Sequence, residues 1–223
     1  MYSIERKMFI MQNNKTIKQF FFYFLFIIIT ATGDAMAFKG NVGVNPWEAV
    51  CQTLNYMTMI KVGTLMMILN SSMILIEMIL MKKIKITMLL QLIVSFLIGF
   101  VVNIIVYILF GNINISSYPL NLCLGILGFI VSATGNGLLM TCDLAPFPFE
   151  GMCEQLSIKF HLDFPKTRQA FDIIFIILCL LTSLIFGYQL AIREGTIISM
   201  LIYSPIMGYV MKKAKPKMIK ILQ

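Results

Sequence analysis

The sequence predicts an all-α, polytopic membrane protein: six transmembrane helices in two inverted three-helix repeats, each repeat with one short extra helix. Three observations predict it: long apolar runs, a segment that occurs twice, and an uneven distribution of basic residues. Hydrophobic residues make up 59% of the 223 residues and charged residues 13%, against about 45–50% and about 25% in soluble domains. Because a soluble fold could not bury this much apolar surface, the lipid bilayer is the expected solvent and partner.

Six apolar stretches reach the length of about 20 residues with which a helix crosses the hydrocarbon core. They are 19–39, 62–81, 87–110, 119–141, 169–190 and 195–211. The first stretch also has features of a cleaved signal peptide, since Lys15 and Lys18 precede it and Ala35-Met36-Ala37 resembles a cleavage site. We expect it to be retained, because the same segment recurs inside the chain, where no signal peptidase acts.

Basic residues predict the orientation, because loops on the cytoplasmic side are enriched in Lys and Arg. With the N-terminus inside, fifteen basic residues fall on the inner segments and three on the outer segments. The inner ones are Arg6, Lys7, Lys15, Lys18, Lys82, Lys83, Lys85, Lys159, Lys166, Arg168, Lys212, Lys213, Lys215, Lys217 and Lys220; the outer ones are Lys39, Lys61 and Arg193. Both termini are therefore expected inside, and the net charge of +8 needs no nucleic-acid partner.

One segment occurs twice. "ATGDAMAFKGNVGVNPWEAVCQTL" begins at Ala31 and "ATGNGLLMTCDLAPFPFEGMCEQL" begins at Ala133, and the two align without a gap. The identical pairs are Ile28/Ile130, Ala31/Ala133, Thr32/Thr134, Gly33/Gly135, Pro46/Pro148, Glu48/Glu150, Cys51/Cys153 and Leu54/Leu156. Two unrelated apolar helices would match in Leu and Ile, whereas here Gly, Pro, Glu and Cys match in order.

The repetition divides the chain. We expect a cytoplasmic segment at 1–18, one repeat at 19–110, a second at 119–212 and a basic cytoplasmic tail at 213–223. Each repeat holds three spans, and an odd number makes the second copy enter the membrane from the opposite side. Inverted repeats of this kind recur in secondary transporters, whose binding sites lie at the repeat interface near the midplane.

The similarity continues beyond the repeated segment. Asn70 aligns with Asp172 in the same register. After a shift of seven residues, Thr87, Ser95 and Gly99 match Thr196, Ser204 and Gly208. The third spans of the two repeats are therefore expected to correspond as well.

A short helix follows the first span of each repeat, at 46–59 and 148–160. In the first, Asn45 suits the N-cap, Pro46 the first helical position and Glu48 the third, from which it can reach back to the cap amide. A helix of about 14 residues spans only about 21 Å and cannot cross the membrane. Two interpretations stay open: an amphipathic strut at the interface, or a re-entrant half-helix whose N-terminus faces the membrane interior and can bind an anionic group.

Polar residues at mirrored positions, meaning positions that align between the two copies, are the candidates for a substrate path. Charged groups inside a membrane usually face a cavity or a partner. The candidates are Asp34, Glu48, Asn136, Asp143, Glu150 and Asp172. Arg168 and Asp172 stand four residues apart, which predicts an intrahelical ion pair. The alternative is that these residues cap helices, reach water at the membrane edge or anchor the topology.

No sequence motif predicts an enzyme, since the chain has no G-x-S-x-G, no H-E-x-x-H and no phosphate-binding glycine loop. Five scattered cysteines and the single His161 also predict neither a disulfide framework nor a metal site. We expect no cofactor, and the oligomeric state is not predicted.

The segments "GNVGVNPWEAV…VGT", "APFPFEGMCEQL…KTRQAFD" and "REGTIISMLIYSPIMG" resemble the YczE/YitT class of bacterial integral inner-membrane proteins. The likeness spans about 20–212 and is carried by "NPWE" at 45–48, "TRQAFD" at 167–172 and "EGTI" at 194–197; Arg193-Glu194 departs from the more apolar approach usual there. It implies a multi-pass protein of the bacterial cytoplasmic membrane and no particular chemistry.

Two functions remain in view. The first is a small-solute transporter or permease, coupled to a proton or cation, whose polar residues line a central cavity. The second is a membrane adaptor or regulator whose polar residues face a partner from a dry core.

Overall fold

The computed structural model describes residues 2–222, and side chains are described for residues 16–164 and 166–221. Within this part the chain is all-α, with eight α-helices and one short π-helical segment. The elements are α1 (Tyr2–Gly40), α2 (Pro46–Thr58), α3 (Val62–Met81), α4 (Ile86–Ile104), η1 (Ile105–Leu109), α5 (Tyr118–Met140), α6 (Pro148–Phe160), α7 (Phe164–Phe186) and α8 (Glu194–Leu222).

Five segments are long and apolar enough to cross a membrane. They are Thr16–Gly40, Val62–Met81, Ile86–Leu109, Tyr118–Met140 and Lys166–Phe186. This confirms a multi-pass membrane protein. The sixth predicted span, 195–211, lies within α8 and is not among the five, because small or polar residues such as Ser199, Ser204 and Gly208 lower its mean hydropathy.

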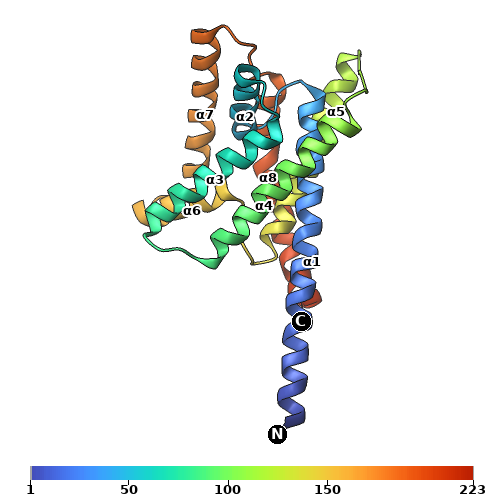
Figure 1. Ribbon diagram of the computed structural model, residues 1–223, viewed down its shortest axis with the longest axis vertical. Helices are drawn as coiled ribbons and strands as arrows, with labels where there is room; N and C mark the ends of the chain where they lie inside the picture. Colours follow the sequence, from blue (N-terminus) through green and yellow to red (C-terminus); the bar gives the residue numbers. More distant parts are fainter. Residues whose placement is uncertain (1, 223) are drawn as a thin grey trace.

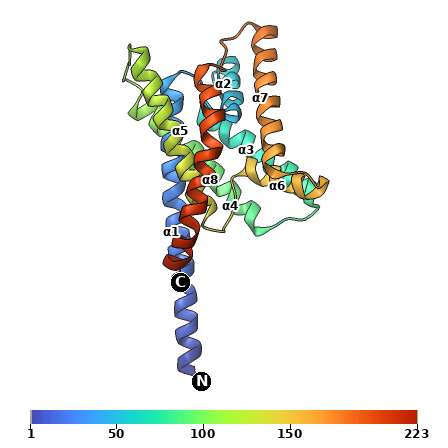
Figure 2. The same ribbon diagram turned by 180° about the vertical axis from the view of Figure 1, so that it is seen from behind.

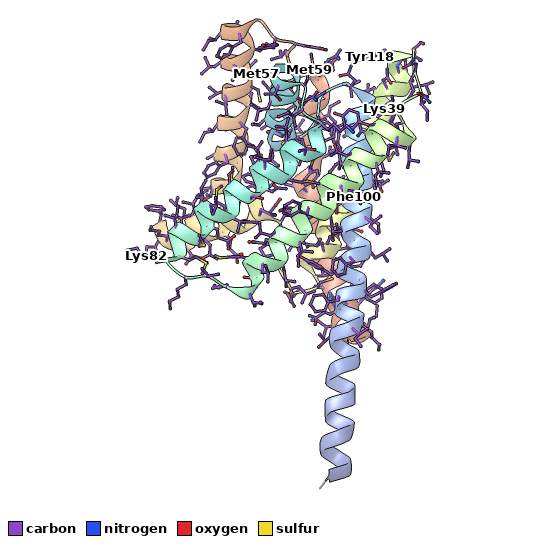
Figure 3. The ribbon with its side chains drawn as sticks, in the orientation of Figure 1. Lys39, Met57, Met59, Lys82, Phe100 and Tyr118 are labelled. Atoms are coloured by element: carbon purple, nitrogen blue, oxygen red, sulfur yellow. The ribbon has the colours of Figure 1, made fainter. Side chains whose placement is uncertain are left out.

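The side chains on the outer surface agree with a bilayer setting. Phe100 projects outward from α4 and is 58% exposed (Figure 3). Other large apolar residues on outer faces are exposed to a similar degree, among them Phe21, Ile79 and Leu184. Water is a poor solvent for such a surface, and lipid tails are a good one. Lys39 lies near the end of the molecule where α2 lies, and Lys82 lies well away from that end, where α3 ends (Figure 3).

The helices alternate in direction along the long axis (Figure 1). Helices α1, α4 and α7 run toward the end where α2 lies, and α3, α5 and α8 run back. Of the two short helices, α2 lies near the C-terminal end of α1, and α6 lies nearer the opposite end (Figures 1 and 2). Helix α2 packs on α3 and α7, and α6 packs on the same two helices.

Helices α1 and α5 form the most extensive contact in the fold, and glycines allow their backbones to meet. A Cβ atom on Gly135 would lie 2.7 Å from the backbone nitrogen of Thr30, and one on Gly33 would overlap the backbone of Ser132. Small residues permit this approach, and in a membrane close packing is a main source of helix association. The crossing fixes how α1 and α5 are rotated, and thus where their polar side chains point.

Helices α7 and α8 are adjacent in the chain, yet little of their length is in contact. The view from behind shows them joined at one end and separated below it (Figure 2). Helices α3 and α4, which come earlier in the chain, pack closely on each other. The contact between α3 and α4 includes Gly63 against Gly99, where no Cβ atom fits on either side.

Candidate functional site: a central polar cavity

All eight helices contribute to a cavity of about 60 Å³ at the centre of the fold. One lining residue from each, in chain order, is Asp34, Glu48, Asn70, Ile98, Asn136, Glu150, Arg168 and Tyr203. A water molecule occupies about 30 Å³ in the liquid. The cavity therefore has room for a few waters or one small ion.

Four of the six predicted path residues meet in this cavity: Asp34, Glu48, Asn136 and Glu150. They come from four helices and form two mirrored pairs, Asp34 with Asn136 and Glu48 with Glu150. All four side chains are buried. Local sequence could place each of them on its helix, but only the packing of α1 on α5 and of the short helices on α3 and α7 brings them together.

Asp34 and Glu48 lie beside each other, within reach of a hydrogen bond between the two carboxyls when one of them is protonated. Their other partners are neutral. Ser132 Oγ donates to Asp34 Oδ1 at 2.5 Å, and Asn45 Nδ2 donates to Glu48 Oε1 at 3.0 Å. Glu48 Oε2 is buried without a hydrogen-bond partner. Among the described side chains, neither carboxyl forms an ion pair.

A chain of hydrogen bonds connects this pair to the second half of the site. Asn136 Nδ2 donates to Tyr203 Oη at 3.3 Å, and the Tyr203 and Ser132 hydroxyls are 3.2 Å apart. Asn136 Nδ2 also lies 3.4 Å from Glu150 Oε1. Because Ser132 donates to Asp34, Tyr203 is the donor to Ser132. Asp34 and Glu150, from the two copies of the repeated segment, are thus linked through three side chains.

Arg168 brings a positive charge to the Glu150 side of the cavity. Its Nε atom lies 3.6 Å from Glu150 Oε1, and its Nη1 atom lies 3.4 Å from Asp172 Oδ2, the pair expected from their spacing. Nη1 also donates to Ser204 Oγ at 2.9 Å. The guanidinium lies over the rings of Phe149 and Tyr203, each at 5.7 Å. The positive charge of Arg168 is therefore paired with two carboxyl groups, and two aromatic rings cover the guanidinium.

An aromatic cluster closes one wall of the cavity. Trp47 and Phe149 stack with ring centroids 5.7 Å apart, and Phe175 packs on both of them. Trp47 Nε1 donates to Asn70 Oδ1 at 3.2 Å. The aromatic residues of the two short helices therefore hold each other in place while the Glu of each helix lines the cavity.

A second and larger opening, about 390 Å³, lies between α7 and α8. Its lining includes Arg168, Gln169, Asp172, Ser204 and Gly208. Arg168 lines both spaces and separates them. Asp172, the fifth predicted path residue, thus lies on the far side of Arg168 from the central cavity.

Asp143, the sixth, lies apart from both spaces. Its side chain is 61% exposed and its Oδ1 atom is 3.6 Å from Lys215 Nζ. Asp143 and its mirrored partner Asn41 both have positive φ angles, 52° and 49°. Asp and Asn tolerate this left-handed conformation better than most residues, so both residues suit the turns that follow α1 and α5.

The short helices place carboxyl groups at their own N-termini. Glu48 and Glu150 are at the third helical positions of α2 and α6, where a negative charge is stabilised by the helix dipole. Asn45 does not cap α2 with its side chain and donates to Glu48 instead. The N-terminus of each short helix therefore already faces a carboxyl group of the same helix. Binding of an anionic group there, which the re-entrant interpretation allowed, is unfavourable.

Ser132 and Tyr203 join the site although the sequence did not single them out. Ser132 aligns with Thr30, a hydroxyl residue that lines the cavity, and this alignment was a usable signal. Tyr203 precedes Ser204, one of the matched residues in the third spans. Its position over the cavity depends on how α8 packs on α5, which no local pattern specifies.

In the part of the chain that the structure describes, no three His, Cys, Asp or Glu side chains lie close enough to hold a metal ion. Searches of curated proteins and of solved structures found no match. A comparison with protein families matched residues 17–212 to a family of unknown function, DUF6198. Since this match covers both copies of the repeated segment and every residue of the cavity, the chain belongs to that family, DUF6198.

Proposed function

We propose that the protein is a small-solute transporter of the bacterial cytoplasmic membrane, coupled to a proton or a cation, and that it works by alternating access. The observation that carries the proposal is the central cavity, where mirrored polar residues of both copies meet. An adaptor would have a dry core with its polar groups facing partners. Buried carboxyl groups around an internal cavity favour transport.

The contacts between helices support an arrangement of six spans in two inverted repeats, with α1, α3 and α4 in one and α5, α7 and α8 in the other. Helix α4 packs on α1 as α8 packs on α5, and α2 packs on α7 as α6 packs on α3. The pairing reaches single residues. Gly33 contacts Ser132, and Gly135 contacts Thr30, which are mirrored contacts.

One pair of contacts breaks this correspondence, and it supports alternating access. Helix α3 packs on α4, whereas the corresponding helices α7 and α8 stand apart. Gly99 is in contact with Gly63, while a Cβ atom on its counterpart Gly208 would meet nothing within 4 Å. Two copies in different conformations are expected if they exchange those conformations during transport. In the second state, α7 would close on α8 and α3 would leave α4.

The open side faces the cytoplasm in the orientation predicted from basic residues. Helix α7 begins, and α8 ends, toward the end of the molecule where Lys82 lies (Figures 1 and 3). That end also carries Lys83, Lys85 and the lysines of α8, as the positive-inside rule requires. Arg168, between the opening and the central cavity, would be the gate on this side. Membership of the YczE/YitT class stays a prediction beside this proposal.

The test is flux of candidate solutes into liposomes that contain the purified protein, with and without a proton or cation gradient. Asp34→Asn should abolish flux while the protein remains folded, since Asn occupies the mirrored position 136. Asp143→Asn is the matched control, because Asp143 is exposed and outside the cavity. The proposal would be contradicted if both variants lost flux equally, or if flux did not change when Asp34 was replaced.

A further inference from the structure

We infer that the central cavity is a binding site for a small monovalent cation, an alkali ion or an ammonium-type nitrogen, held by Asp34, Glu48 and Asn136. The inference deepens the proposed function and rests on it for its biological meaning. Binding itself requires no transport, however, so it can be tested separately.

Two buried oxygen atoms that lack a partner point to a ligand. Glu48 Oε2 and Asn136 Oδ1 receive no hydrogen bond from an N–H or O–H group of the described residues, and the Asp34 carboxyl beside Glu48 can be a partner only if a proton lies between the two. The Glu48 and Asn136 side chains are buried, with residue exposures of 6% and 3%, and both line the cavity. Buried polar atoms are nearly always satisfied, so an orphan atom in a native structure calls for an explanation. Both atoms are acceptors, and the missing partner is therefore a donor or a cation.

The charges around the cavity select a cation. Asp34 and Glu48 receive hydrogen bonds from neutral groups, Ser132 and Asn45. Arg168 also lines the cavity, and its Nε atom forms no hydrogen bond, but its charge is paired with Glu150 and Asp172. Two carboxyl groups side by side without a positive partner repel each other unless a proton or a cation lies between them.

The size and shape of the site restrict the cation. A volume of about 60 Å³ admits an ion that has lost most of its hydration, or a small ammonium group, and it excludes bulky organic cations. The oxygen atoms of carboxyl, amide and hydroxyl groups are the ligands that hard cations prefer. Of the three acids that line the cavity, Glu150 is paired with Arg168, so only Asp34 and Glu48 are left to hold a cation, which favours a single positive charge over a divalent ion. Trp47 lines the same cavity, and aromatic rings attract cations.

Trp47 is the only tryptophan in the chain, so intrinsic fluorescence of the purified full-length protein in detergent reports on this cavity. We would titrate NaCl, KCl, NH₄Cl and methylammonium chloride at constant ionic strength, with N-methylglucamine chloride as the replacement. At least one small cation should give a saturable change in fluorescence, and replacing chloride by gluconate should leave that change unaltered. Isothermal titration calorimetry provides a second readout if binding does not alter the fluorescence.

The variants Glu48→Gln and Asp34→Asn should each weaken binding by about tenfold or more, since each removes a charge that the cation contacts. Both substitutions preserve side-chain shape, and an unchanged circular dichroism spectrum and elution profile would show that the fold persists. Asp143→Asn should bind as the unaltered protein does. The inference is overturned if neither readout detects binding of any small cation, or if Glu48→Gln and Asp34→Asn bind as tightly as the unaltered protein.

The two proposals fail in different ways. If cation binding depends on Glu48 but no solute is transported, the transporter proposal is wrong and the cation site stands. If a solute is transported but no small cation binds, the cation site is wrong and the transporter proposal stands.

Discussion

Trp47 of α2 stacks on Phe149 of α6, with ring centroids 5.7 Å apart and the rings 12° from parallel. The two residues occupy the same position in the two copies of the repeated segment. Mirrored residues touch each other only where the two copies meet. Glu48 and Glu150, one residue further along each copy, line the cavity next to this contact, so the site lies at the junction of the copies.

The first prediction concerns topology. A reporter fused after Asn114 should report the outside of the cytoplasmic membrane, and one fused at the C-terminus the inside, because the basic residues gather in segments assigned to the cytoplasm. A phosphatase active only outside and a fluorescent protein active only inside would measure this. If both positions report the same side, six spans and the inversion of the repeats are both wrong.

The second prediction concerns the acidic residues. Asp34→Ala and Asp172→Ala should each reduce flux by about tenfold or more, because each removes a charge from the cavity or from its Arg168 gate. The amount of protein in the membrane should stay near that of the unaltered chain. Asp143→Ala, outside both spaces, should leave flux unchanged. Low abundance of the Asp34 and Asp172 variants would instead identify these residues as necessary for packing or insertion.

The third prediction uses two corresponding glycines. Gly99→Leu should lower thermal stability in detergent, since its side chain would overlap the backbone of Gly63; overpacking typically costs about 1–3 kcal/mol. Gly208→Leu should fold normally, because a Cβ atom there meets nothing within 4 Å. It should nevertheless block flux, since the added side chain prevents α7 from closing on α8. A Gly208→Leu protein with full flux would contradict that closure.

The fourth prediction concerns accessibility from the cytoplasm. Ser204 lines the opening between α7 and α8, whereas its counterpart Ser95 is fully buried. In a chain whose exposed Cys123 is replaced by Ser, Ser204→Cys should react quickly with an impermeant thiol reagent in inside-out vesicles, and Ser95→Cys slowly.

A transported solute should change the two reaction rates in opposite directions, because closing one side opens the other. The chain with only the Cys123 replacement serves as the control, since its four remaining cysteines are buried. Rates that never respond to any solute that crosses the membrane would argue against alternating access.

Several features of the fold follow from local sequence. The short helices predicted at 46–59 and 148–160 are observed as Pro46–Thr58 and Pro148–Phe160. Proline is favoured at the first helical position, and the length of an apolar run determines whether it can span a bilayer. For the same reason, five of the six predicted spans are recovered as candidate membrane helices. These signals depend only on residues near each other in the chain.

The composition of the site depended on the tertiary structure. Asp34, Glu48, Asn136 and Glu150 line one cavity, Asp172 lies behind Arg168, and Asp143 lies at the surface. The difference arises because the direction of a side chain depends on how its helix is rotated, and the glycine contacts between α1 and α5 set that rotation. Matched polar residues such as Ser95 and Ser204 occur on both pairs of helices, and α3 packs on α4 whereas α7 and α8 stand apart, so a shared local pattern does not decide which pair is in contact.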